Sequence, residues 1–375
     1  RVLSVTSEAV PLIKTGGLAD VAGALPAAVL PHGIEITTLL PGYPSVLAKL
    51  GRLRVVHAWD SLLGEPARLL AGMLPNTQEG SPLVVLDAPG LFAREGSLYT
   101  DPAGRDWPDN WRRFAALSRA AADVAAGAIV VRGKQRLFDV LHAHDWQAAL
   151  APAYLRWAMP AEAPPIPSVM TIHNMAFQGF HGAEIFPRLG LPRGAWSVDG
   201  VEYHGGVSLL QAGLVAASAI TTVSPTYAQE IRSAEFGMGL QGVIAARGGD
   251  VSGILNGIDT ELWNPESDPV IAKRFTARAL GQRVANKRAL EATFGLEPGE
   301  GARAGGPLFV VISRLTWQKG MDVLLESIDH LVGIGGRLAL LGSGDPDLEA
   351  GFQAAAARYP GRVAVRIGYD EDLSH

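Results

Sequence analysis

The first 26 residues, RVLSVTSEAVPLIKTGGLADVAGALP (Arg1–Pro26), place a short apolar run, a glycine-containing loop and an alanine-rich stretch in direct succession. The run Val2–Thr6 is short and rich in β-branched residues, which is typical of a buried strand. The stretch Leu18–Leu30 has the composition of a helix. Strand, loop and helix in this order form the repeating unit of a parallel sheet covered by helices. The opening of the chain therefore predicts an α/β fold.

The same alternation continues to about residue 256 and predicts a mostly parallel, doubly wound sheet with helices on both faces. Further strands are expected at Ile34–Leu40, Leu53–His57, Leu83–Leu86, Asp139–His142, Ser168–Ile172, Ala219–Val223 and Ser252–Leu255. Further helices are expected at Asn110–Ala126, Trp146–Trp157, Val207–Ala217 and Pro225–Ser233. The stretch from Leu53 to Leu86 lacks a clear helical pattern, which indicates a β-hairpin inserted into the alternation.

The alternation of strand and helix patterns stops after Asn256. A loop-rich stretch with one expected helix, Val284–Phe294, extends to Gly306. The alternation then restarts with strands at Leu308–Ser313, Arg337–Leu341 and Val363–Ile367 and helices at Met321–Val332 and Asp347–Arg358. Because 375 residues exceed the usual size of one core, we predict two domains, 1–256 and 257–375. Three parallel strands make a small sheet, so we expect the second domain to be truncated at His375.

Composition narrows the class of protein. A net charge of −5 and a pI of about 6.0 argue against binding to nucleic acid or to an anionic membrane surface. The chain has no cysteine, which excludes disulfides, zinc–thiolate sites and thiol nucleophiles. No apolar run reaches the roughly 18 residues of a membrane span, and no signal-peptide pattern is visible. We therefore expect a cytoplasmic protein, although a cysteine-free composition also fits an exported one.

The loop after the first strand, Lys14–Asp20, has the residues of an anion site. The adjacent glycines Gly16 and Gly17 let backbone N–H groups approach a ligand closely. The N-terminus of the following helix adds partial positive charge, and Lys14 adds a full one. Together these features suit a diphosphate. The spacing matches neither the dinucleotide fingerprint nor a P-loop, and the alternative is a tight turn with a surface lysine.

Polar residues also follow the strand expected at Asp139–His142. Since ligands bind at the carboxyl ends of parallel strands, this position favours a functional role. His144 and Asp145 suit acid–base chemistry or hydrogen bonds to sugar hydroxyls, and Trp146 suits stacking on a sugar ring. The alternative is that Asp145 caps the next helix and Trp146 is a core residue. A metal site is less favoured, because we expect His142 and His144 on opposite faces of the strand.

Two further strand ends carry polar residues. His173 and Asn174 end the strand at Ser168–Ile172. A lone histidine more often has a structural role. A functional role for His173 is favoured by the adjacent Asn174 and by the other polar strand end nearby in sequence. Ser224-Pro225, after the next strand, is a helix start and needs no functional explanation.

The segment Ser313–Gly320 follows the first strand of the second domain and carries two cations, Arg314 and Lys319, in one loop. Two positive charges in such a position can neutralise a departing diphosphate. The alternative is that both are solvated surface charges.

Taken in order, these segments resemble bacterial glycogen synthases and plant starch synthases. The resemblance extends over the whole chain and rests on Lys14–Asp20, His142–Trp146, Thr171–Asn174, Asn256–Asp259 and Ser313–Gly320. It implies the GT-B fold, in which two Rossmann-like domains face each other across the cleft that holds the active site. It also implies retaining transfer of glucose from ADP-glucose to the non-reducing end of an α-1,4-glucan such as glycogen or a maltooligosaccharide, without a cofactor or metal.

The resemblance also implies roles for individual residues. His173 resembles an active-site histidine near the reacting sugar. Arg314 and Lys319 resemble the pair that stabilises the leaving ADP. Asp20 resembles a polar group near the donor. Asn256 is placed at the cleft between the domains. The implied substrate-binding residues are Lys14, Thr15, Gly16, Gly17, Tyr99, His144, Asp145, Trp146, Asn174 and Asn256.

The sequence departs from the family in two respects. Gly206 and Gln211 stand where many family members have lysines. The family also continues past His375 with a segment whose glutamate contacts the donor sugar, so we expect this chain by itself to be inactive. The alternative function is that of a non-catalytic glucan- or nucleotide-binding fragment.

Two further enzyme classes are less favoured by the sequence. A dinucleotide-dependent oxidoreductase is disfavoured by the missing fingerprint. A phosphorylase of the same fold is not formally excluded, but its opening loop is not expected to read Lys-Thr-Gly-Gly. UDP-glucose is an alternative donor, and the sequence leaves the oligomeric state open.

Overall fold

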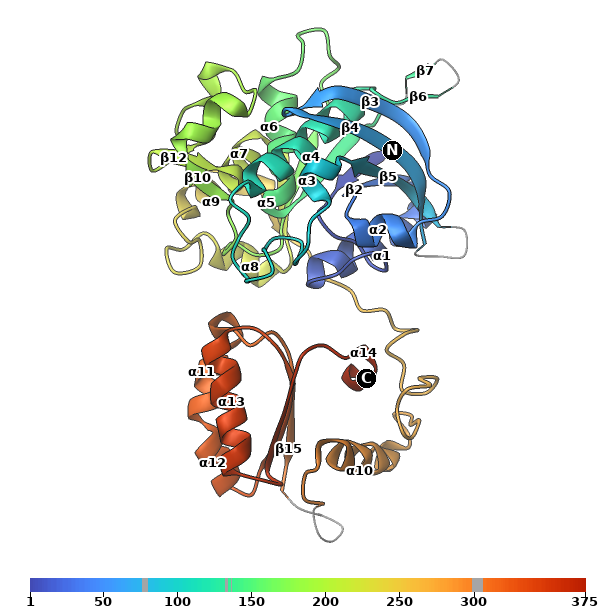
Figure 1. The fold of residues 1–375 in the computed structure, drawn as a ribbon, viewed down its shortest axis with the longest axis vertical. Helices are drawn as coiled ribbons and strands as arrows, with labels where there is room; N and C mark the ends of the chain where they lie inside the picture. The colour runs from blue at the N-terminus through green and yellow to red at the C-terminus, as the bar shows by residue number, and fades with distance from the viewer. Residues whose placement is uncertain (76–79, 132–133, 136, 299–305) are drawn as a thin grey trace. The chain divides into compact units, whose positions relative to one another are not determined.

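The computed structural model describes residues 1–75, 80–131, 134–135, 137–298 and 306–375 (Figure 1). The chain divides into two compact units, Arg1–Gly257 and Ile258–His375. These limits differ by one residue from the predicted domains, 1–256 and 257–375. Each unit has its own sheet and its own hydrophobic core. Within the described ranges, no helix combines the length and the apolar character needed to cross a bilayer.

Unit 1 is built on a nine-stranded sheet with the order β14-β13-β9-β8-β1-β2-β5-β4-β3. Its parallel strands are β1 (Val2–Val5), β2 (Ile36–Pro41), β5 (Ser81–Asp87), β8 (Val140–His144), β9 (Ser168–Ile172), β13 (Ala219–Thr222) and β14 (Val251–Gly253). The antiparallel hairpin of β3 (Arg54–Leu62) and β4 (Glu65–Leu74) extends the sheet beyond β5. The expected inserted hairpin is therefore present, and β4 is a strand that the sequence analysis did not identify.

The helices of unit 1 connect these strands and cover the sheet. They are α1 (Gly17–Val29), α2 (Pro44–Lys49), α3 (Pro89–Phe92), α4 (Asn110–Ala125), α5 (Asp145–Ala148), α6 (Leu150–Trp157), α7 (Leu209–Ala216), α8 (Pro225–Glu230) and α9 (Gln241–Ala246). Short 3₁₀ helices lie at Leu30–His32, Ala183–Arg188, Arg193–Ala195 and Gly248–Asp250. Two small antiparallel sheets complete the unit: β10 (Phe180–Gly182) with β12 (Gly206–Ser208) and β11 (Glu202–Tyr203), and β6 (Val130–Val131) with β7 (Lys134–Gln135).

Two helix predictions in unit 1 need correction. The helix expected at Val207–Ala217 begins only after β12, where the Ser208 hydroxyl accepts the backbone N–H of Gln211 at 3.2 Å and caps α7. The helix expected at Trp146–Trp157 is divided into α5 and α6. By contrast, Ser224 caps α8 as predicted, accepting the backbone N–H of Tyr227 at 2.9 Å.

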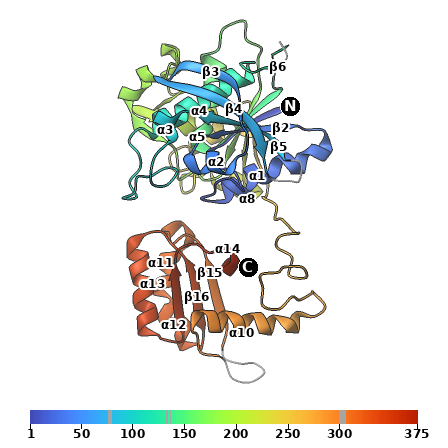
Figure 2. The same ribbon diagram turned by 45° about the vertical axis from the view of Figure 1, so that its right-hand side comes forward.

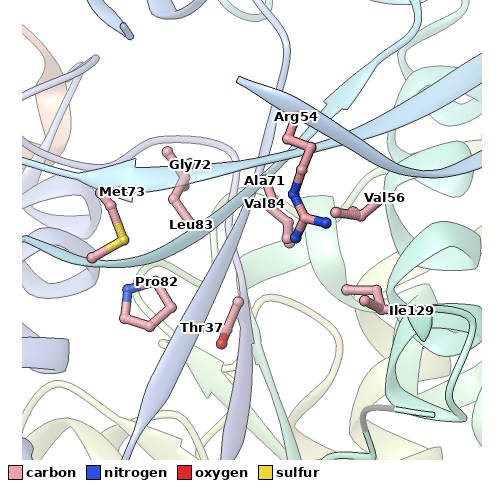
Figure 3. Close-up of a pocket in the computed structure, with 10 residues that line it drawn as sticks. All are labelled: Thr37, Arg54, Val56, Ala71, Gly72, Met73, Pro82, Leu83, Val84 and Ile129. Carbon is pink, nitrogen blue, oxygen red and sulfur yellow. The ribbon is translucent and has the colours of Figure 1, made fainter. Parts of the chain in front are cut away.

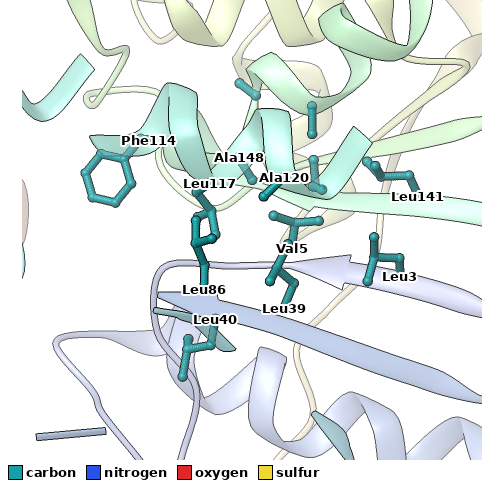
Figure 4. Packing of buried hydrophobic residues seen from close by; sticks show 14 of the residues in the cluster. Leu3, Val5, Leu39, Leu40, Leu86, Phe114, Leu117, Ala120, Leu141 and Ala148 are labelled. Atoms are coloured by element: carbon teal, nitrogen blue, oxygen red, sulfur yellow. The ribbon is translucent and has the colours of Figure 1, made fainter. Parts of the chain in front are cut away.

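The main core lies between the central strands and α4. Leu3 and Val5 of β1, Leu39 of β2 and Leu141 of β8 are fully buried and pack with Leu117 of α4 (Figure 4). Burying one such side chain stabilises the fold by about 2 kcal/mol. The alanines of α4 keep this helix close to the sheet, because a small side chain brings the helix axis near the strands. The central strands are therefore rigidly held, and so are the starts of the loops that follow them.

The order of strands reverses at β1. Strand β1 pairs in parallel with β2 on one side and with β8 on the other. The strands from β2 to β5 therefore lie on one side of β1, and the later strands from β8 onward lie on the other. In open parallel sheets, ligands bind beyond the carboxyl ends of the strands at such a point. The loops after β1, β8 and β9 are the ones placed there.

A cavity of about 200 Å³ lies elsewhere in unit 1, beside the antiparallel strands (Figure 3). Its lining is mainly apolar and includes Thr37 near the start of β2, Leu83 near the start of β5, and Ile129. Thr37 and Leu83 lie near the amino ends of parallel strands, so the cavity is separate from the loops at the carboxyl ends of those strands.

Unit 2 has a three-stranded parallel sheet with the order β15 (Leu308–Ile312), β16 (Arg337–Gly342) and β17 (Val363–Ile367). Its helices are α10 (Arg283–Phe294), α11 (Met321–Glu326), α12 (Ile328–Gly333), α13 (Pro346–Arg358) and α14 (Glu371–Ser374), with 3₁₀ turns at Leu280–Gln282 and Trp317–Lys319. Helices α11, α12 and α13 lie along one face of this sheet (Figure 2). The single helix expected at Met321–Val332 is thus two helices that meet at Ser327.

Candidate active site

The loop after β1 is held in place by Glu8, a carboxylate that the sequence analysis did not single out. Glu8 is only 3% exposed. The Thr15 hydroxyl donates to its Oε1 at 2.7 Å, and the backbone N–H groups of Thr15 and Gly16 both donate to its Oε2. The hydroxyl of Tyr99 donates to Oε1 at 2.9 Å. Glu8 therefore ties the middle of the loop to the end of β1, and it connects Tyr99 to the same point.

The glycines of this loop face open space. A Cβ atom at Gly16 or Gly17 would meet no described atom within 4 Å, so packing does not require glycine at either position. Gly16 is the residue before the first turn of α1, whose first N–H groups have no partner within the helix. The exposed backbone and the partial positive charge of the helix start suit an anion.

Lys14 and Asp20 form an ion pair beside these glycines, with 3.0 Å between Nζ and Oδ1. Both side chains are exposed, and an exposed pair of this kind contributes only about 0–1 kcal/mol. A bound phosphate can therefore replace Asp20 as the partner of Lys14 with little loss of free energy. The predicted residues Lys14 to Asp20 are thus together at the carboxyl end of β1.

Histidines from β8 and from the end of β9 form a connected cluster. His144 Nδ1 lies 3.0 Å from His173 Nε2, and His144 Nε2 lies 3.1 Å from the Ser4 hydroxyl of β1. The rings of His142 and His144 are 4.1 Å apart between centroids. The expectation that these two rings lie on opposite faces is wrong, because residues two apart in a strand point to the same side.

Several ring nitrogens of the cluster are engaged in hydrogen bonds within the protein. Both ring nitrogens of His144 are already in hydrogen bonds with Ser4 and His173. The Nε2 atom of His142 lies 2.6 Å from the Thr171 hydroxyl. Across the part of the chain that the structure describes, no group of three or more His, Cys, Asp or Glu side chains is arranged to hold a metal ion.

Burial decides the charge of these groups. It lowers the pKa of His142 and of His173 to about 4, and it lowers the pKa of His144 well below the usual value, with the neighbouring imidazoles adding to the effect. All three rings are neutral at pH 7. Burial also raises the pKa of Asp145 to about 7, although backbone N–H groups of His173 and Asn174 counteract it.

Acidification from pH 7 to pH 5 is expected to lower the free energy of unfolding of unit 1 by a few kcal/mol. The histidine pKa values are depressed in the folded state, so the unfolded state binds more protons between about pH 4 and 6.5, and stability is lost as pH falls through that window. At pH 5, proton uptake by the unfolded state lowers the free energy of unfolding by roughly 2 kcal/mol for His142 and by the same amount for His173. Asp145 acts in the opposite direction, because its raised pKa means that protonation stabilises the folded state, also by roughly 2 kcal/mol.

Urea denaturation at pH 5, 6 and 7 measures this dependence. In Asp145→Asn the acid loss should become steeper, because the opposing group is gone. Asparagine keeps an acceptor oxygen and tolerates the left-handed backbone (φ 54°) found at this position. Stability independent of pH over this range would show that the three rings are not neutral and buried.

Asp145 joins the loops after β8 and β9. Its Oδ1 accepts the backbone N–H of His173 at 2.6 Å and that of Asn174 at 3.4 Å. The alternative that Asp145 is the N-cap of the following helix is wrong, since α5 begins at Asp145 and His144 holds the N-cap position. Trp146 packs edge-on against Phe114 with 5.0 Å between ring centroids. This contact favours the core role of Trp146 over stacking on a sugar.

Tyr99 lies far from the first strand in sequence but is brought to the loop that follows it. Besides its bond to Glu8, its hydroxyl is 2.8 Å from the Ser7 hydroxyl, and the Asn110 amide donates to its backbone carbonyl at 2.8 Å. Burial, with Glu8 adding to it, holds the pKa of Tyr99 well above the usual value, so the phenol stays protonated and can donate. Asn256 is exposed at the end of unit 1, and its side chain makes no hydrogen bond to another described residue.

In unit 2, Arg314 and Lys319 lie on the loop between β15 and α11, as predicted. Both side chains are exposed, and neither has a hydrogen bond or ion pair to another described residue. The loop itself is fixed, because the Leu315 backbone N–H donates to the Ser343 carbonyl at 3.0 Å and the Leu315 carbonyl accepts the Asp345 N–H at 2.8 Å. Within the described residues, two unpaired cations thus stand on an anchored loop at the carboxyl end of a strand.

The two departures from the family have structural roles here. The Gln211 side chain is buried and donates to the backbone carbonyls of Val198, Gly200 and Glu202. A Cβ atom at Gly206 would come within 2.5 Å of the His181 carbonyl oxygen. Neither position can hold a lysine without rearrangement of these neighbours.

Comparison with known proteins agrees with this arrangement. The family model described as the starch synthase catalytic domain matches residues 1–246. The chain is 67% identical to a glycogen synthase of Novosphingobium aromaticivorans and 54% identical to glycogen synthase 1 of Rhizobium meliloti, in each case over all of this chain and 75% of the relative. The catalytic domain of starch synthase IV from Arabidopsis thaliana, bound to ADP and acarbose, superposes with a TM-score of 0.81 at 30% identity, covering 100% of this chain and 75% of that one.

The doubly wound sheet of unit 1, the second α/β unit and the likeness to the starch synthase structure place the chain among glycosyltransferases with the GT-B fold. The chain belongs to the glycogen synthase and starch synthase family, and its function is that of this family.

Proposed function

We propose that the protein transfers glucose from ADP-glucose to the non-reducing end of an α-1,4-glucan, with retention at the anomeric carbon and without a metal or cofactor. The observation that carries the proposal is the loop after β1, where Glu8 holds the chain so that Gly16 and Gly17 face open space beside the exposed Lys14. The Arabidopsis relative, which is bound to ADP and acarbose, supports an adenine nucleotide and a glucan-like sugar as ligands.

In the proposed reaction the bond between the sugar C1 and the β-phosphate oxygen breaks, and its electron pair leaves with ADP. The acceptor hydroxyl forms the new bond to C1 and loses its proton. Negative charge therefore grows on the diphosphate, where fixed cations and N–H groups stabilise the transition state most. We assign this role to Lys14, to the start of α1, and to Arg314 and Lys319.

The sugar side of the site is assigned to the loops after β8 and β9. His173 lies at the end of β9, and its backbone N–H is fixed by Asp145. His144, Asn174 and Tyr99 belong to the same edge of the sheet or are tied to it by hydrogen bonds. We assign His173 to the reacting sugar and the others to binding or to support of the site.

The proposal is tested with the complete gene product, ADP-glucose or UDP-glucose as donor, and a maltooligosaccharide as acceptor. We expect glucan-dependent release of ADP, elongation by α-1,4-linked glucose, and weaker use of UDP-glucose. Lys14→Ala should lower kcat/KM for ADP-glucose at least about tenfold, since a charge-assisted contact to phosphate is lost.

The matched control is Arg52→Ala, which removes an exposed cation elsewhere in unit 1 and should retain parental kinetics. A clear preference for UDP-glucose would refute the donor assignment. ADP release without glucan elongation would refute the acceptor, and parental rates in Lys14→Ala would refute the role of the loop.

A further inference from the structure

Three side chains, of which two are buried, form a line from the middle of β1 to the candidate sugar site. The Ser4 hydroxyl is 3.1 Å from His144 Nε2, and His144 Nδ1 is 3.0 Å from His173 Nε2. Ser4 is 2% exposed and His144 is fully buried, whereas His173 is partly exposed. One end of the line is therefore sealed in the core, and the other end reaches the surface at the carboxyl edge of the sheet.

The sealed end fixes the direction of the hydrogen bonds. Within the described residues, the Ser4 hydroxyl has one hydrogen-bond partner, His144 Nε2. A buried hydroxyl that fails to donate its proton is costly, so Ser4 donates to Nε2, and Nε2 carries no proton. A neutral imidazole has a single N–H, so the proton of His144 is on Nδ1.

The same logic extends to the next ring. His144 Nδ1–H points at His173 Nε2, which must accept and therefore carries no proton. A neutral His173 then has its proton on Nδ1. Within the described residues His173 Nδ1 has no hydrogen-bond partner. The depressed pKa values of both rings agree with their being neutral at pH 7.

We infer that Ser4 is a positioning residue that sets the tautomers of His144 and His173, so that His173 offers an N–H donor, and not an acceptor nitrogen, to the bound sugar. The ligand class follows from this polarity: the partner of Nδ1 is an oxygen able to accept, such as a sugar hydroxyl or ring oxygen. The assignment of a sugar as ligand rests on the proposed function, whereas the tautomers rest on the hydrogen-bond geometry alone.

The tautomers can be measured without substrate. Long-range ¹H–¹⁵N correlation spectra of the complete gene product, labelled at histidine, distinguish protonated from unprotonated ring nitrogens, and His144→Gln and His173→Gln assign the signals. We expect His144 and His173 both in the Nδ1–H form at pH 7. In Ser4→Ala both rings should shift toward a mixture of tautomers, and in Ser4→Thr, which keeps the hydroxyl, both should return to Nδ1–H.

The kinetic counterpart is a fall in kcat of about tenfold in Ser4→Ala with less change in KM, and recovery in Ser4→Thr, since one hydrogen bond to the reacting sugar is misdirected in part of the molecules. Ser118→Ala is the matched control: it removes another buried hydroxyl, 3.4 Å from the Gln147 carbonyl, and should change neither tautomers nor kcat.

The outcomes separate the two proposals. An Nε2–H form of either ring in the unmodified protein overturns the inference, and this measurement does not depend on whether Ser4→Ala folds. Unchanged spectra and kcat in a folded Ser4→Ala also overturn it. If the tautomers are as inferred but no glucose is transferred, the inference on Ser4 stands and the proposed function fails.

Discussion

Arg314→Ala is expected to lower kcat for glucose transfer by about 10²–10³-fold, with a smaller rise in KM for ADP-glucose. The reason is that removal of a fixed cation from a developing oxyanion costs transition-state stabilisation of about 3–4 kcal/mol. Lys319→Ala should act in the same direction, and Arg314→Lys should recover only part of the rate, since an ammonium group lacks the planar fork that holds two phosphate oxygens.

This experiment decides between the two interpretations of the loop after β15. Both cations are exposed, which fits solvated surface charge as well as a site that waits for a ligand. Arg358→Ala is the control within unit 2, because Arg358 of α13 forms an exposed pair with Asp329 and should leave kcat within about twofold. Rates like those of the control in both Arg314→Ala and Lys319→Ala would assign the two cations to the surface.

The parallel strands of the two main sheets were predictable because most of them are short apolar runs bounded by polar or glycine residues. Strands β1, β9 and β17 lie within a residue of their predicted limits. Strand β4 was missed, since its residues Glu65–Leu74 include charged and small side chains that pair near the edge of the sheet and need little hydrophobic pattern. The breaks at Ala149 and at Ser327 divide two helices that the sequence predicted as continuous.

The candidate site was predictable at the ends of strands and not beyond them. Lys14, His173 and Arg314 were found because strand ends in a parallel sheet are where ligands bind. Glu8 was missed, because its function is to accept hydrogen bonds from a loop seven residues later and from Tyr99, and no local pattern reveals such partners. Its one signal is an acidic residue inside an otherwise apolar and hydroxyl-bearing stretch.

The histidine cluster shows a different limit. Its members were identified, but the geometry was predicted wrongly for His142 and His144, which share one face of β8. The chain of hydrogen bonds from Ser4 to His173 crosses three strands, β1, β8 and β9. Only the register of those strands brings these side chains together, and register is a property of the folded sheet.

The largest effect on stability is expected in unit 2, from the buried ion pair between Glu291 of α10 and Arg337 of β16. Arg337 Nη1 is 2.6 Å from Glu291 Oε1, and both side chains are 2% exposed. Burial acts to raise the pKa of Glu291, but the hydrogen bonds and charges of Arg288 and Arg337 outweigh it, so the pKa is lowered and the carboxylate is charged. The Glu297 carbonyl also accepts from Arg337 at 2.5 Å.

Glu291→Ala is expected to lower the free energy of unfolding of unit 2 by about 3–5 kcal/mol, because it leaves the buried guanidinium of Arg337 without its carboxylate. Arg337→Met should cost less, because Glu291 keeps its ion pair with Arg288 at 2.7 Å. The double variant Glu291→Leu/Arg337→Met should recover most of that loss, since no charge is then buried. Urea denaturation of the complete gene product, followed by hydrogen exchange of the β16 amides, measures both effects. Arg358→Ala, which breaks an exposed pair, should cost less than about 1 kcal/mol. If the double variant were as unstable as the sum of the single ones, the pair would stabilise α10 on the sheet through packing of its side chains and not through charge.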